Sequence, residues 1–268
     1  MKLAHIVPVS LLSTVPNEQS LHLVLSELVL SDERYFRFYA ERKNAGDFII
    51  LDNPVHEDRP VKFEHWIEAI MLLQPNVAVV PDVIDSTLMT LDNAREAVAR
   101  FREYHFPQTE LMAVPHSQTQ YGWLQCATEL ARLGDPLRWF GISLERRLDN
   151  DPLALIRRRE RVDMMLSFPE RFGHIKLHLL GVSERGDELG NDSIWQRAHS
   201  ADSSKFAVWS MLGTPVSPPV PILQPYPGRG TFGGSYEYFL AGHPQGLSRR
   251  KMLRNLRQWN EYAESEKD

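Results

Sequence analysis

The sequence has one cysteine, Cys126, among its 268 residues. A single cysteine excludes an intrachain disulfide framework and a zinc site built from several thiolates. A chain without disulfides fits a reducing compartment, so we expect a cytoplasmic protein. No apolar run is long enough to span a bilayer, and the apolar start MKLAHIVPVS is too short for a secretory signal. We therefore expect no membrane partner.

The chain also lacks a strong net charge and the common cofactor motifs. It carries 30 basic and 35 acidic residues, a net charge of −5, so its total charge does not attract nucleic acid. It has no GxxxxGK[ST] phosphate loop and no HxH or HExxH spacing. We therefore expect no cofactor and no metal, and any nucleic-acid contact must come from local basic patches.

What the chain does have is a core and an alternating pattern. Hydrophobic residues make up 43% of it, which is enough for one sizeable core. The predicted strands are 5–9, 48–52, 77–82, 111–116, 140–144, 175–181 and, more weakly, 199–204. The predicted helices are 32–44, 64–73, 86–104, 123–133, 152–166 and 191–197. This alternation predicts an α/β fold, a TIM-type (β/α)8 barrel spanning 1–268 as a single domain, with the eighth strand left unassigned.

The last quarter of the chain has a different composition. Residues 213–234 are rich in proline and glycine and predict a loop excursion, while 247–263 predict a basic helix. The candidate nucleic-acid contacts there are Arg229, Arg249, Arg250, Lys251, Arg254 and Arg257. A second basic patch comprises Arg146, Arg147, Arg157, Arg158, Arg159 and Arg161. An ordinary solvated helix face is the alternative for both patches.

Polar residues follow several predicted strands. Asp52, Asp82 and His116 end three predicted strands, and Asp202 lies in the last one. The carboxyl ends of parallel barrel strands meet at one mouth, where the chemistry of such barrels occurs. Three aspartates would then converge there. The alternative is that each aspartate merely caps the helix after its strand.

The order of these segments resembles that of the tRNA-guanine transglycosylase superfamily. Within it, the resemblance is to the shorter DNA-guanine transglycosylases of bacteriophages and of bacterial 7-deazaguanine DNA-modification systems. The likeness extends from Phe48 to Trp209 and rests on short motifs. The zinc subdomain of the tRNA enzymes, built on three cysteines and a histidine, is excluded by the single cysteine.

Two segments match family motifs that end in aspartate. The segment LDNPVHE has Asp52 where the family has an acid/base aspartate. It departs from the family motif at Pro54 and Val55, where small residues are usual, and at His56, which replaces an aromatic residue. The segment VVPDVIDSTLMTLDNARE has Asp82 where the family has the aspartate that reads the purine edge.

Three further segments imply base-binding residues. VPHSQT has His116 where the family has a base-binding glutamine, with Gln118 close by, and which of the two takes that role stays open. FGISLER has Gly141 at the glycine that contacts the base. LHLLGVS matches the family through Leu180 and Gly181.

The segment HSADSSKFAVW has Asp202 where the family has its nucleophile. The resemblance therefore implies a pentosyltransferase whose partners are DNA and a 7-deazaguanine base such as preQ0. A carboxylate nucleophile and a second carboxylate for proton transfer fit base exchange through a covalent intermediate.

Three other functions remain open from the sequence. The first is an RNA-acting member of the same superfamily. The second is a metal-assisted barrel hydrolase that uses His56, His116 and Asp202. The third is a DNA-binding protein without catalytic activity.

Overall fold

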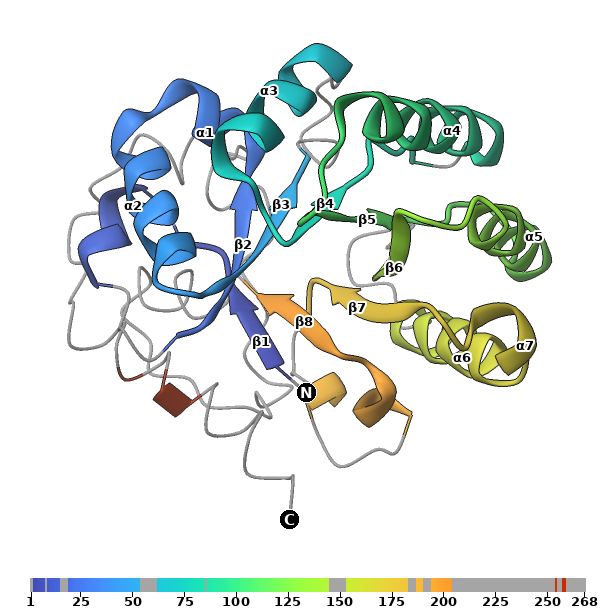
Figure 1. Ribbon diagram of the computed structural model, residues 1–268. Helices are drawn as coiled ribbons and strands as arrows, with labels where there is room; N and C mark the ends of the chain where they lie inside the picture. The colour runs from blue at the N-terminus through green and yellow to red at the C-terminus, as the bar shows by residue number, and fades with distance from the viewer. Residues whose placement is uncertain are drawn as a thin grey trace.

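The computed structural model describes residues 2–7, 9–14, 19–53, 62–84, 86–144, 153–182, 187–189, 194–203, 254, 257 and 258. Eight parallel strands close into a barrel in chain order, with helices outside the ring (Figure 1). The strands are β1 (Lys2–His5), β2 (Leu21–Leu25), β3 (Phe48–Asp52), β4 (Val77–Val79), β5 (Glu110–Ala113), β6 (Leu137–Ser143), β7 (Lys176–Leu180) and β8 (Ser200–Ser203). The predicted TIM-type barrel is confirmed.

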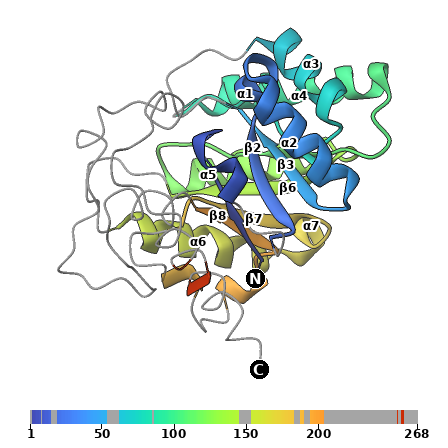
Figure 2. The same ribbon diagram turned by 90° about the vertical axis from the view of Figure 1, so that its left-hand side faces the viewer.

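The helices and 3-10 turns lie between these strands, and Figure 2 shows the arrangement from the side. The helices are α1 (Ser26–Ser31), α2 (Glu33–Asn44), α3 (Phe63–Leu73), α4 (Thr87–Tyr104), α5 (Gln120–Ala131), α6 (Ala154–Leu166) and α7 (Pro169–Phe172). The 3-10 turns are η1 (Val9–Thr14), η3 (Asp187–Leu189) and η4 (Trp195–Arg197).

Two strand predictions need correction. The first strand is residues 2–5 rather than 5–9, and it pairs with β8 from Lys2↔Ser200 to His5↔Ser203. The strand that the pattern did not identify is β2, which pairs with β3 along its whole length. It runs directly into α1, so no turn residue separates the two elements.

The helix predictions differ mostly at their ends. The helix predicted at 123–133 begins three residues earlier, because Thr119 is its N-cap and accepts a hydrogen bond from the Gly122 N–H at 3.0 Å. Ser86 caps α4 in the same way, as expected for a polar residue between a strand and a helix. Within 191–197, the described part is the short turn η4 rather than an α-helix.

The core has two layers. A large outer cluster lies between the strands and the surrounding helices. A smaller inner cluster fills the barrel and comes from alternating strand positions: Ala4, Leu21, Leu23, Ile50, Val77, Val79, Met112, Val114 and Trp139. Period-2 alternation therefore places the side chains of Asp52, two residues after Ile50, and of His178, two residues before Leu180, on the inner face.

Candidate functional site

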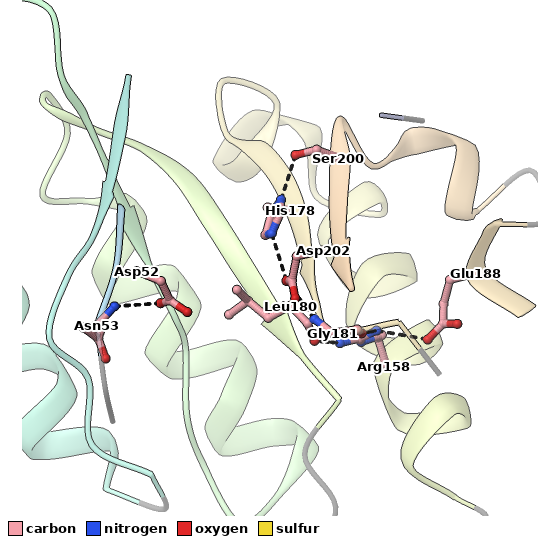
Figure 3. A network of polar contacts seen from close by, with 9 residues as sticks. All are labelled: Asp52, Asn53, Arg158, His178, Leu180, Gly181, Glu188, Ser200 and Asp202. Carbon is pink, nitrogen blue, oxygen red and sulfur yellow. Dashed lines mark hydrogen bonds and ion pairs between the residues drawn. The ribbon is translucent and has the colours of Figure 1, made fainter. Parts of the chain in front are cut away.

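Asp202 lies on β8, and its carboxylate is held on one side. Its Oδ1 accepts a hydrogen bond from the Gly181 N–H at 2.8 Å and lies 3.2 Å from His178 Nε2 (Figure 3). The side chain keeps an exposed fraction of 7%. Within the described part of the chain, no hydrogen bond or ion pair engages Oδ2. One oxygen of Asp202 is thus held, and the other has no partner within the described part of the chain.

His178 on β7 connects Asp202 to a serine deeper in the barrel. Its Nδ1 lies 2.7 Å from Ser200 Oγ, and both side chains are buried. Register brings them together, because His178 pairs with Ser200 across β7 and β8. No sequence motif indicated this role for His178. The i, i+2 spacing of Ser200 and Asp202 indicates that both side chains lie on the same face of β8. The sequence does not show the register between β7 and β8 that brings His178 to them.

Below Asp202, a buried ion pair supports the turn after β7. Arg158 on α6 is fully buried and pairs with the fully buried Glu188 at 3.0 Å. The Arg158 guanidinium also donates to the carbonyl of Gly181 at 2.6 Å and to that of Leu180. Burial lowers the pKa of the Arg158 guanidinium, against the charges of Glu188 and Asp202, which raise it. Gly181 has φ +68°, which favours glycine.

A second polar cluster follows β3, β4 and β5. Asp82 is buried, its Oδ2 lies 2.5 Å from His116 Nε2, and its Oδ1 accepts a hydrogen bond from Asn53 Nδ2 at 3.2 Å. Asn53 also donates from its backbone to Asp52 Oδ1 at 2.9 Å. Each carboxylate oxygen has two acceptor positions, so Asp82 retains capacity for a ligand. The sequence did not predict that Asn53 contacts Asp82.

The residues expected to bind a base differ in burial and in their contacts. His116 is buried and contacts Asp82, whereas Gln118 is exposed. Gly141 lies next to Leu180, since a Cβ atom there would come within 2.6 Å of Leu180 Cδ1 and 3.1 Å of Val114 Cγ2. In Figure 3 the Leu180 side chain lies between Asp52 and the Asp202 group. Gly141 therefore makes room for the Leu180 side chain.

The basic patches are only partly described. Arg254 and Arg257 are exposed and helical. Outside the described residues lie the loop 213–234 with Arg229, most of 247–263 including Arg249, Arg250 and Lys251, and also His56, Arg146 and Arg147.

The prediction of a basic surface patch around α6 is wrong for two of its arginines. Arg158 and Arg161 have exposed fractions of 0% and 2%, because they bind groups inside the molecule rather than solvent. Arg161 donates from Nε to Gln120 Oε1 at 3.0 Å and lies over the Trp123 ring. Two of the arginines proposed for a surface patch therefore belong to the core.

Two further structural observations concern ligands and membranes. No group of three or more histidine, cysteine, aspartate or glutamate side chains is arranged to hold a metal ion among the described residues. Of the helices in the described ranges, none has the length and apolar character needed to cross a membrane.

Comparison of the chain with protein-family models and with curated proteins found no match.

Proposed function

We propose that the protein is a DNA-guanine transglycosylase that exchanges guanine in DNA for a 7-deazaguanine base such as preQ0. The observation that carries the proposal is the Asp202 carboxylate, with Oδ1 held by two donors and Oδ2 without a partner among the described residues. It lies at the carboxyl end of the barrel, the end at which such barrels carry out catalysis.

In this proposal Asp202 is the nucleophile. Its Oδ2 attacks C1′ of a guanine nucleotide, the bond from C1′ to the base breaks, and the electron pair leaves with the purine. The product is an ester between Asp202 and the deoxyribose. Holding Oδ1 fixes the orientation of the carboxylate, which lowers the entropic cost of the attack.

Asp52 is the proposed acid and base. The leaving guanine needs a proton, and the incoming base must lose one before its nitrogen attacks C1′ and displaces Asp202. A single carboxyl group serves both steps, since it gives a proton in the first and takes one in the second. The arrangement that supports this role is the position of Asp52 on the inner face of β3, across Leu180 from Asp202.

Asp82 and Leu180 are the proposed binding residues. The carboxylate of Asp82 accepts from the N1–H and the exocyclic amine of a guanine-like edge, while His116 and Asn53 fix its orientation. Leu180 and Val114 supply apolar contact for the flat ring. A base paired in a duplex must leave the stack to reach this mouth, and the exposed Arg254 and Arg257 are candidates for backbone contact.

The test is a trapped covalent adduct. The protein is incubated with guanine-containing DNA, denatured, and separated on a gel that resolves protein–DNA conjugates. Wild type and Asp92→Asn, a control at an exposed aspartate on α4, should both form a conjugate. Asp202→Asn should form none while its thermal unfolding stays cooperative. A conjugate of normal yield in Asp202→Asn would refute the assignment.

A further inference from the structure

We infer that Ser200 and His178 form a positioning relay that favours release of Asp202 from the covalent intermediate. The inference rests on the proposed function. It concerns two residues that do not touch the reacting carbon and that act through the Asp202 carboxylate. The three side chains lie in one line from the barrel interior to the mouth (Figure 3).

For an ionised Asp202 and a neutral His178, the chemistry of the three groups gives the direction of the hydrogen bonds. An ionised Asp202 only accepts, so His178 Nε2 carries the proton that lies between them at an Nε2–Oδ1 distance of 3.2 Å. In the neutral imidazole, Nδ1 is then an acceptor. Ser200 Oγ, 2.7 Å away, therefore donates to it. Asp202 thereby selects the histidine tautomer, and Ser200 satisfies Nδ1 and holds the ring in that orientation.

The location of the relay argues against a purely structural role. The inner face of the barrel also carries a cluster of apolar side chains. His178 and Ser200 have exposed fractions of 0% and 3%, and burying polar groups is unfavourable unless they are paired. An apolar pair of similar size would fill this space without that cost. Among the described hydrogen bonds, the Ser200–His178 pair has one further side-chain partner, which is Oδ1 of Asp202.

Donors at Oδ1 act differently on the two states of the carboxylate. In the intermediate, Oδ2 is bonded to C1′ and Oδ1 is a neutral carbonyl oxygen. When the incoming base attacks C1′, the bond from C1′ to Oδ2 breaks, and its electron pair returns to a carboxylate whose charge is shared with Oδ1. The N–H groups of His178 and Gly181 bind that charged oxygen more strongly than the ester carbonyl. The relay therefore favours free enzyme over adduct.

A matched pair of substitutions separates this role from packing. The amide of glutamine reaches the place of histidine Nε2, whereas the shorter amide of asparagine reaches only that of Nδ1. His178→Gln thus keeps a donor for Asp202, and His178→Asn keeps a partner for Ser200 but removes that donor. Both replace the ring by a smaller polar group, so both lose similar packing.

The measurement is the ratio of conjugate to free protein at steady state, with DNA in excess and preQ0 limiting. We expect His178→Asn to raise this ratio about tenfold, equivalent to about 1.4 kcal/mol, and His178→Gln to stay near wild type. Equal ratios in wild type and both variants, or equal changes in both variants, would overturn the relay alone. Absence of any conjugate in wild type would overturn the proposed function together with it.

A second measurement does not depend on the reaction. The ¹⁵N shifts of selectively labelled histidine distinguish the Nε2–H from the Nδ1–H tautomer, and loss of one signal in His178→Gln assigns it. We expect Nε2–H in wild type and also in Ser200→Ala, where loss of the donor to Nδ1 should shift the Nδ1 signal. An Nδ1–H signal in the wild-type protein would overturn the direction of the relay.

Discussion

The buried ion pair between Arg158 and Glu188 allows a test of what stabilises the turn that donates to Asp202. Replacing Arg158 by methionine keeps most of the side-chain length and removes the guanidinium. The change leaves Glu188, which is fully buried, without the cation it faces at 3.0 Å. It also removes the donors to the carbonyl oxygens of Leu180 and Gly181.

The magnitude follows from these contacts. Removing one partner of a buried ion pair costs about 3–5 kcal/mol, because the other charge stays buried without its ionic partner. For a chain of this size that corresponds to a melting temperature about 10 °C lower. Glu188→Gln keeps an amide oxygen for Arg158 and should cost less, about 1–3 kcal/mol. The same loss of support should loosen the turn at Gly181 that donates to Asp202.

Urea denaturation of the two single variants and of the double variant Arg158→Met/Glu188→Gln completes a cycle. We expect the double variant to lose less than the sum of the singles by at least about 1 kcal/mol, since neither charge of the pair is then buried. The double variant should still be less stable than wild type, because the carbonyl oxygens of Leu180 and Gly181 have lost the donors that Arg158 provides. A cost below about 1 kcal/mol for Arg158→Met would refute the buried-pair reasoning.

Two further predictions concern the barrel itself. Gly141→Ala places a Cβ within 2.6 Å of Leu180, so we expect a loss of about 1–3 kcal/mol by denaturation, reduced in the Leu180→Ala background; additive losses would contradict the contact. Burial lowers the pKa of His22 below 6.5, although Asp47 opposes the shift. The folded protein therefore resists protonation that the unfolded chain accepts, and stability should fall as the pH drops below 6.5. His22→Gln should flatten that slope in denaturation curves, and an unchanged slope would contradict this origin.

The sequence was informative where strands and helices are separated by turn residues. β3 was recognised as an apolar run ending at Asp52 and β7 as one ending at Gly181, while α4 was recognised from the helical spacing of its apolar residues. The run LHLVLSELVL contains β2 and the start of α1 without a glycine or proline between them. Neither the two-residue period of a strand nor the 3.6-residue period of a helix is visible over so few residues, so β2 was not predicted.

The candidate site was predictable at the level of elements but not of contacts. Parallel strands bring Asp52 and Asp202 to one end of the barrel by topology alone, so their convergence followed from the fold. The partners of these residues depend on register and on distant segments. His178 meets Asp202 only because β7 and β8 pair in one particular register. Arg158 and Glu188 come from two separate parts of the chain, so their pairing was not predictable from spacing.

The most direct test of the central claim is base exchange. Duplex DNA carrying radiolabelled guanine is incubated with the protein and unlabelled preQ0, with single-stranded DNA and tRNA in parallel, and the label retained in each polymer is measured. We predict loss of label from DNA that requires both preQ0 and Asp202. Loss from tRNA alone would contradict the choice of DNA, and retention of label in all three would contradict base exchange.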